Sequence, residues 1–284
     1  MTVLQAIVLG IVQGVTEFLP VSSSAHLIIV PWLLGWPAPS LSFDAALHLG
    51  TLAAVLVYFW RDLLAMLLAL PRALSRPGQV LTSSNPDDVS PRLALLIALG
   101  TIPGLIVGYL GQNWIEEAYH SESGLSDRII VAIAMALAGL ALFLLVAERV
   151  AKHERGLASL RLPDALMIGL AQAAALIPGV SRSGATITAG LFRGLTREDA
   201  ARFSFLLGVP IIAAAGAKGL VDVLGSGLDT SQLIVFVIGL ATSAIAGFAA
   251  ISVLLRYLQR SSTMVFIIYR IALALGLVIL AAVR

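Results

Sequence analysis

The sequence predicts an all-α integral membrane protein with about six transmembrane helices and two re-entrant helical hairpins arranged as an inverted repeat. Composition is the first of three observations behind this prediction. Of the 284 residues, 59% are hydrophobic and only 12% are charged, a balance far from that of a soluble domain. The second observation is that long apolar segments recur from end to end. The third is that two further apolar stretches are each broken by proline and serines.

Six segments have roughly the 17 to 23 apolar residues that a helix needs to cross a hydrocarbon core. They are Ala45–Trp60, Leu93–Gly111, Ile129–Ala147, Phe203–Val221, Leu233–Leu255 and Met264–Val283. Because these segments are spread over the whole chain, we expect residues 1–284 to form a single polytopic domain.

Two other apolar stretches, Val3–Gly35 and Pro163–Phe192, contain near their middle a proline followed by a serine-rich cluster. Backbone polar groups freed by such a break cannot remain unpaired in hydrocarbon, so a broken segment must lie inside protein or line a watery cavity. We interpret both stretches as re-entrant helical hairpins.

An internal repeat relates the two hairpins. Placing Gly10 on Gly169 also aligns Gln13, Val21, Ser22 and Ser24 with Gln172, Val180, Ser181 and Ser183. The repeats would cover about residues 1–147 and 160–284, and an odd number of crossings between them inverts the second. Inverted repeats of this kind bring their two breaks together near the membrane midplane. The two polar clusters are therefore predicted to form one site.

Charges in the connecting segments predict the orientation. Pro71–Arg92 and Glu148–Leu162 are rich in arginine, whereas Gln112–Arg128 and Asp222–Gln232 are mainly acidic. By the positive-inside rule the first pair is cytoplasmic and the second pair lies outside. The net charge of +2 comes without a dense basic run, so we expect no nucleic-acid partner. The chain also has no cysteine, which excludes disulfides, thiolate metal ligands and a cysteine nucleophile.

The first polar cluster contains Gln13 and Glu17, which share one helical face, followed by Ser23 and His26. A carboxylate in an apolar segment costs roughly 2.5–3.5 kcal/mol on insertion scales, so Glu17 is interpreted as a metal ligand or general base. The alternative is that Glu17 sits close to an interface or caps the serine turn. The serines alone would be helix caps, but His26 follows Ser23 at a spacing that suits nucleophilic catalysis.

The second polar cluster is typical of a phosphate cradle. Its candidate phosphate-binding residues are Gly179, Ser181, Arg182, Ser183 and Thr186. Glycines allow a close approach of the backbone, and amides before a new helix attract anions. The planar, permanently charged fork of Arg182 suits phosphate oxygens. The structural alternative for Arg182 is an ion pair with Glu17, which the repeat would bring near.

The remaining ionisable residues in apolar segments are assigned no chemistry. His48, His120 and His153 are expected to be core or surface residues. Lys218 and Arg270 lie in predicted spans without polar neighbours in the sequence. We interpret these two as snorkelling side chains or interior pairs.

At these two clusters the chain closely resembles the undecaprenyl-pyrophosphate phosphatase family, also called the bacitracin-resistance family. Its signatures, Glu/Gln-x-x-x-Glu and Pro-Gly-x-Ser-Arg-Ser-x-x-Thr, are matched by Gln13–Glu17 and Pro178–Thr186. The resemblance extends over essentially the full chain. It departs at Gln13, where many members have a second glutamate, and at Ala25, where glycine is common. Gln13 weakens any mechanism that needs two carboxylates on this helix.

The resemblance implies hydrolysis of undecaprenyl diphosphate to undecaprenyl phosphate and inorganic phosphate, which recycles the lipid carrier of cell-wall synthesis and confers bacitracin resistance. It implies a multi-pass protein of the bacterial inner membrane, and we expect its site to open to the periplasmic face. The expected catalytic residues are Glu17, Ser23, His26 and Arg182. The expected phosphate-binding residues are Gln13, Gly179, Ser181, Arg182, Ser183 and Thr186.

The mechanism expected from the sequence uses a divalent cation, magnesium or calcium, assisted by Glu17. Ser23 would attack the terminal phosphorus with His26 as general base, or His26 would attack through a phosphohistidine. The expected partners are the polyprenyl diphosphate lipid, membrane lipid and, as a further option, a second copy in a homodimer. The alternative function is a transporter or flippase of a lipid phosphate or small anion, since such proteins also have broken helices in inverted repeats.

Overall fold

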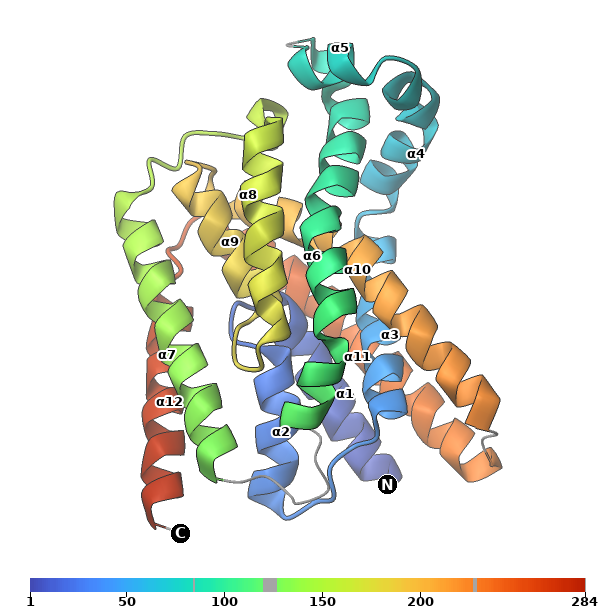
Figure 1. The fold of residues 1–284 in the computed structure, drawn as a ribbon, viewed down its shortest axis with the longest axis vertical. Helices are drawn as coiled ribbons and strands as arrows, with labels where there is room; N and C mark the ends of the chain where they lie inside the picture. The colour runs from blue at the N-terminus through green and yellow to red at the C-terminus, as the bar shows by residue number, and fades with distance from the viewer. Residues whose placement is uncertain (84, 120–126, 227–228, 284) are drawn as a thin grey trace.

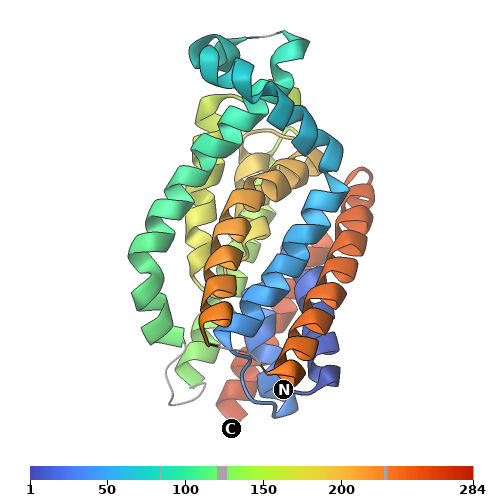
Figure 2. The same cartoon turned by 90° about the vertical axis from the view of Figure 1, so that its right-hand side faces the viewer.

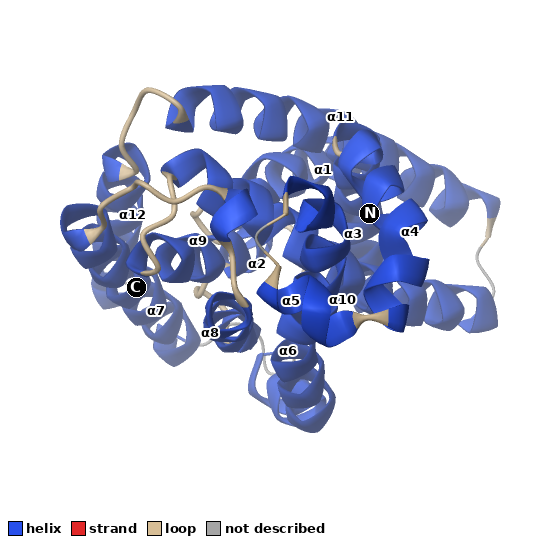
Figure 3. Ribbon diagram, turned by 90° about the horizontal axis from the view of Figure 1, so that it is seen from above, coloured by secondary structure: helices blue, strands red, loops and turns tan. Residues whose placement is uncertain are grey.

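The computed structural model describes residues 1–83, 85–119, 127–226 and 229–283, except for the side chains of residues 41, 112–119, 218, 220, 222–226 and 231. These residues form α-helices joined by loops and short 3-10 helices, with no β-strand among them (Figure 3). The α-helices are α1 (Val3–Phe18), α2 (Ser23–Leu34), α3 (Leu41–Tyr58), α4 (Trp60–Ser75), α5 (Pro77–Thr82), α6 (Val89–Tyr119), α7 (Asp127–Val150), α8 (Leu162–Ala173), α9 (Arg182–Phe192), α10 (Arg197–Ser226), α11 (Thr230–Leu258) and α12 (Met264–Val283).

The predicted transmembrane segments are confirmed as helices. Within the described part of the chain, five helices are long and apolar enough to cross a membrane, namely α6, α7, α10, α11 and α12. The bent pair α3 and α4 adds a sixth. Each of the six spans predicted from the sequence overlaps one of these helices, and the protein is a multi-pass, all-α membrane protein.

Helix α4 is a feature that the sequence did not predict. It meets α3 at an angle of 79° across a break at Phe59. Its Leu64, Leu67 and Leu68 are exposed, while Met66 is buried against the bundle. An amphipathic helix with an apolar outer face suits the membrane interface better than a crossing. Arg61 and Asp62 mark the end of the predicted span, but no residue in this stretch indicates that the next helix turns aside, because apolar length does not show direction.

The two broken stretches are helical hairpins that enter the bundle from opposite ends (Figure 1). The hairpin of α1 and α2 begins and ends at the end of the molecule where both termini lie. The hairpin of α8 and α9 begins and ends at the opposite end, near α5. In both hairpins a serine caps the returning helix. Ser22 accepts a hydrogen bond from the amide of Ala25 at 3.4 Å, and Ser181 accepts one from the amide of Gly184 at 3.0 Å. The equivalent serines of the sequence repeat therefore have equivalent structural roles.

Each hairpin packs against a long helix from the other half of the chain: α1 lies along α11, and α8 lies along α6. Glycines at equivalent positions permit both contacts. A Cβ on Gly10 would lie 1.9 Å from Oγ1 of Thr242, and a Cβ on Gly169 would lie 2.1 Å from the carbonyl oxygen of Gly100. The pairs α3–α10 and α7–α12 also join the two halves (Figure 2). This exchange of partners is consistent with an inverted repeat.

The end of the molecule that carries α5 is rich in arginine. Asp164, fully buried, accepts hydrogen bonds from Arg155 at 2.6 Å and from Arg193 at 2.5 Å. Hydrogen bonding to Asp164 raises the pKa of the Arg155 guanidinium above its ordinary value. Glu148 pairs with Arg197 at the same end. His120, the side chain of Lys218 and much of the two acidic segments fall outside the described residues.

Candidate active site

The two polar clusters meet inside the bundle, where the last turn of α1 faces the first turn of α9. The guanidinium of Arg182 donates to Oε1 of Glu17 from Nη2 at 3.0 Å and from Nε at 3.3 Å. Their side chains are only 11% and 5% exposed. This is the ion pair considered from the sequence, and it lies at the junction of the two breaks. A buried carboxylate is tolerated here because it is paired and hydrogen-bonded.

A cavity of about 190 Å³ adjoins this pair. Its polar lining comes from Glu17, the serines of residues 22–24, His48, Gln172, Ser181 and Arg182. Apolar residues of the second break and of α10, together with Gly104 of α6, complete the lining. The volume suits a small anionic head group and is far too small for a polyprenyl chain, which would have to remain in the lipid.

Glu17 is the centre of the hydrogen-bond network. Its Oε2 accepts the hydroxyl of Ser23 at 2.7 Å and the amide Nε2 of Gln13 at 3.2 Å. Nε2 of His48 lies 3.8 Å from the same oxygen. A serine hydroxyl held by a carboxylate is the arrangement that turns an otherwise weak alcohol into a nucleophile. Gln13, where many relatives were expected to have glutamate, acts here as a donor to the single carboxylate.

His26 does not bond to Ser23, contrary to the pairing expected from their spacing. Its Nδ1 lies 2.6 Å from the carbonyl oxygen of Ser22 and its Nε2 lies 2.6 Å from the hydroxyl of Tyr269. A carbonyl can only accept, so Nδ1 carries a proton and Nε2 of the neutral ring accepts from the tyrosine. His26 is buried and lies outside the cavity lining. The three-residue spacing places Ser23 and His26 one turn apart on α2, but it does not determine where the imidazole of His26 points.

Arg182 is held in place by α10. Its Nη1 donates to the carbonyl oxygen of Ser204 at 3.1 Å. A Cβ on Gly208 would lie 2.1 Å from the same nitrogen. The guanidinium thus lies against the backbone of α10 and contacts Glu17 on its opposite edge. Its position depends on residue 208 being glycine, which has no side chain to displace it.

The other predicted phosphate ligands are divided between the cavity and the surrounding structure. Ser181 lines the cavity, and its Oγ lies 3.0 Å from that of Ser183. Ser183 donates to the carbonyl oxygen of Leu19 at 3.0 Å, which ties the second break to the first. Thr186 lies 2.6 Å from the hydroxyl of Ser204. Gly179 has a φ of 95°, a conformation for which glycine is suited.

Arg270 was misinterpreted from the sequence. It is fully buried rather than snorkelling, and no carboxylate pairs with it among the described residues. Its guanidinium instead donates to main-chain carbonyls of Pro20 at 3.2 Å and Gly179 at 3.0 Å, one in each break, and to two residues of α7. Arg270 therefore fixes the two breaks relative to each other.

His48 and Gln172 line the cavity although neither was expected to. Nδ1 of His48 lies 2.8 Å from the carbonyl oxygen of Asp44, which leaves Nε2 facing Glu17. The sequence contained two usable signals. His48 lies within a predicted span, and Gln172 is the repeat counterpart of Gln13.

The expected divalent cation does not fit as a resident ion. The described residues contain no group of three or more His, Cys, Asp or Glu side chains that could hold a metal. Glu17 is the one carboxylate that the described part of the chain contributes to the cavity lining, and its oxygens already accept from Arg182, Ser23 and Gln13. A guanidinium on the same carboxylate disfavours a second cation there.

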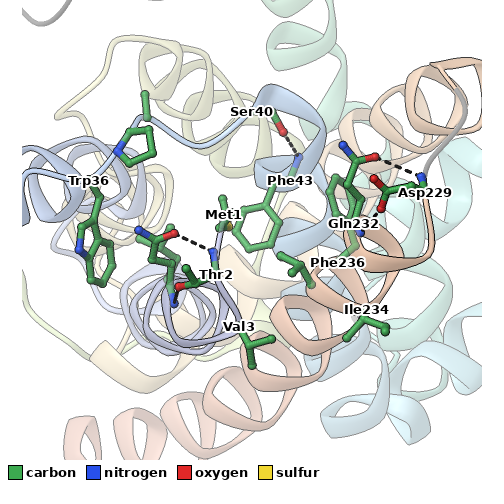
Figure 4. A pocket seen from close by; sticks show the side chains of 15 residues that line it. Met1, Thr2, Val3, Trp36, Ser40, Phe43, Asp229, Gln232, Ile234 and Phe236 are labelled. Atoms are coloured by element: carbon green, nitrogen blue, oxygen red, sulfur yellow. Dashed lines mark hydrogen bonds between the residues drawn. The ribbon is translucent and has the colours of Figure 1, made fainter.

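A larger cavity, of about 800 Å³, lies where α1, α3 and α11 approach the end of the molecule that carries the termini (Figure 4). Its polar groups are occupied in capping helices. Thr2 and Gln5 cap α1, Ser40 caps α3, and Asp229 and Gln232 cap α11. Among the described residues, no arginine, lysine or histidine side chain lines it.

The fold and the smaller cavity define a class: a multi-pass membrane protein whose two broken helices meet at an interior cavity lined by an arginine and by a serine that is hydrogen-bonded to a carboxylate. The family model described as bacitracin resistance protein BacA matches residues 6–276. The undecaprenyl-diphosphatase of Thermomicrobium roseum is 50% identical, covering 100% of this chain and 99% of its own length. Those of Moorella thermoacetica and Rubrobacter xylanophilus are 47% and 48% identical, with at least 95% of each chain covered. The chain belongs to the BacA family.

Proposed function

We propose that this protein hydrolyses undecaprenyl diphosphate to undecaprenyl phosphate and inorganic phosphate. The observation that carries the proposal is the Ser23 hydroxyl, 2.7 Å from Glu17, in a cavity that also contains Arg182. A diphosphate supplies the negative charge that Arg182 recognises and the phosphorus that Ser23 attacks. Its family and the names of its relatives support the same activity. Recycling of the lipid carrier and bacitracin resistance would follow from this reaction.

In the proposed mechanism, Arg182 binds oxygens of the terminal phosphate and Ser23 Oγ attacks its phosphorus. Glu17 takes the proton from Ser23 as the bond from phosphorus to the bridging oxygen breaks, and it passes this proton to the undecaprenyl phosphate that leaves. A water molecule then attacks the serine phosphate. Glu17 takes a proton from this water and returns it to Ser23 Oγ as the bond from Oγ to phosphorus breaks, and inorganic phosphate is released. Arg182 stabilises the charge on the transferring group in both steps.

His26 has a different role in this proposal from the one expected from the sequence. Its hydrogen bond to the carbonyl of Ser22, where φ is 79°, stabilises an unfavourable backbone conformation immediately before Ser23. It would thereby orient the nucleophile. The alternative, attack by His26 through a phosphohistidine, requires the ring to leave both Ser22 and Tyr269.

We propose that the cavity opens to the outer, periplasmic face of the bacterial inner membrane. Its lining includes Gly104 and Ile211, at the middle of α6 and α10, and Ala215, in the half of α10 that lies away from the arginine-rich end. Cysteine labelling tests this orientation cleanly because the chain has no cysteine. In intact cells an impermeant maleimide should label Ala38→Cys and leave Gln79→Cys unlabelled. The reverse pattern would place the cavity on the cytoplasmic side.

For the expected magnesium or calcium ion, we propose that it arrives bound to the phosphates of the lipid rather than being held by the protein. The absence of a metal-binding cluster among the described residues supports this assignment. Chelation should then lower the apparent affinity for substrate and leave the melting temperature of the protein unchanged.

The test of function is phosphate release from undecaprenyl diphosphate by the purified protein in detergent, with magnesium or with a chelator. Wild type should release phosphate, and Ser23→Ala of equal thermal stability should not. The alternative, a transporter or flippase of a lipid phosphate or small anion, moves its cargo intact. No release from well-folded wild type would favour that alternative.

A further inference from the structure

Gln172, in the last turn of α8, has a buried amide without a protein partner. The residue is 3% exposed, and neither Oε1 nor Nε2 makes a hydrogen bond to another described residue. It nevertheless lines the cavity that contains Glu17 and Arg182. Buried amides are normally hydrogen-bonded, because leaving one unpaired is unfavourable. An unpaired amide at the wall of a binding cavity is therefore placed to bond to what enters it.

Close packing, rather than hydrogen bonding, fixes the position of this side chain. A Cβ on Gly104 of α6 would lie 3.4 Å from Nε2 of Gln172 and 3.7 Å from its Cγ. Gly169, one turn earlier in α8, contacts the backbone of Gly100. Two helices that approach this closely through glycine leave the amide little freedom, so it is pre-positioned at the cavity wall.

The repeat counterpart shows what is unusual about Gln172. Gln13 occupies the equivalent place in α1, and its Nε2 donates to Glu17, four residues later. Four residues after Gln172 the chain has Leu176, which offers no acceptor. The glutamine amide at this repeat position thus donates to the catalytic carboxylate in the first half of the molecule, as Gln13, and has no acceptor within the described chain in the second half, as Gln172.

We propose that Gln172 is a substrate-binding residue that donates a hydrogen bond from Nε2 to a phosphate oxygen of the diphosphate head group. This inference rests on the proposed function of the same site. The amide is neutral, so it adds a directional contact without neutralising the phosphate charge that Arg182 recognises. Its carbonyl oxygen can accept from a protonated phosphate oxygen or from water.

The test compares Gln172→Met with wild type in the phosphate-release assay. Methionine has nearly the same length and packs in the same space, but it has no amide donor. Loss of a hydrogen bond to a charged group should raise KM for undecaprenyl diphosphate by about 10- to 100-fold, with kcat changed less than about threefold. Gln172→Glu should bind more weakly still, because it adds a negative charge to the cavity that would hold the phosphates. Gln79→Ala, an exposed glutamine of α5, is the matched control and should behave as wild type.

Binding measured without turnover separates this inference from the proposed function. In a Ser23→Ala background, Gln172→Met should raise the Kd for undecaprenyl diphosphate by the same factor by which it raises KM in the active enzyme. An active wild type together with unchanged KM and Kd in Gln172→Met would overturn the inference and leave the phosphatase proposal intact. A lowered melting temperature with unchanged KM would make Gln172 a packing residue only. An inactive wild type would instead remove the phosphatase proposal, whatever Gln172 does.

Discussion

Replacing Arg182 by alanine is expected to lower kcat/KM for phosphate release by about 10³- to 10⁵-fold, the range for a single arginine that stabilises a transferring phosphoryl group. Among the described residues, Arg182 is the one arginine or lysine in the cavity lining. Its removal also leaves the buried Glu17 without its cation, so the melting temperature has to be measured in parallel. Arg182→Lys keeps the charge but loses the planar group that binds two oxygens at once. Its kcat/KM should therefore lie between those of wild type and Arg182→Ala.

Gly208→Ala tests the position of this arginine without changing its charge. The added methyl would lie 2.1 Å from Nη1 of Arg182, so the guanidinium has to move. A displacement of about 1 Å at a catalytic group can cost on the order of 100-fold in rate. Gly276→Ala in α12 is the control, because no atom lies within 4 Å of its added methyl. A folded Arg182→Ala enzyme with near-normal turnover would refute the phosphate-binding role.

The second large effect is expected at Ser23. Ser23→Ala should reduce turnover by at least about 10³-fold, since removal of an activated nucleophile is not compensated by its neighbours. Substrate labelled in its terminal phosphate should give a transient phosphoenzyme after rapid acid quenching. The label should be stable in acid, as a serine phosphate is, and mass spectrometry should place it on Ser23.

His26 provides the contrasting case. An acid-labile label, or a label that persists in Ser23→Ala, would identify a phosphohistidine and contradict the serine mechanism. Tyr269→Phe removes only the hydroxyl that contacts Nε2 of His26. If His26 merely orients the turn at Ser22, this change should reduce the rate no more than about tenfold, the value of one neutral hydrogen bond.

The fold could be predicted well from the sequence because lipid imposes simple rules on length and polarity. Apolar length located the six spans, and the need to pair backbone groups identified both breaks. The bend at Phe59 escaped prediction because the charges of Arg61 and Asp62 mark the end of a span but not the direction of the helix that follows. The direction of a helix after such a bend depends on packing against α6 and on the interface, neither of which has a local signature.

The meeting of Glu17 with Arg182 could also be predicted, since the repeat brings the two breaks together. The partners of individual side chains could not. Ser23 and His26 are neighbours on α2, yet one faces α1 and the other faces α12. Arg270 lacked visible partners because they are main-chain carbonyls, which every residue carries. A sequence pattern can predict which side chains lie near one another. It cannot predict which hydrogen-bond acceptors orient them, because those acceptors are brought together only when the chain folds.

The buried guanidinium of Arg270 also bears on biosynthesis. It belongs to α12, which is synthesised after both breaks, and it supplies donors to the carbonyls of Pro20 and Gly179 in those breaks. Until α12 inserts, those carbonyls lack this partner in the interior of the bundle. We therefore expect the nascent chain to remain inactive until α12 docks, because the two breaks are fixed relative to each other only then.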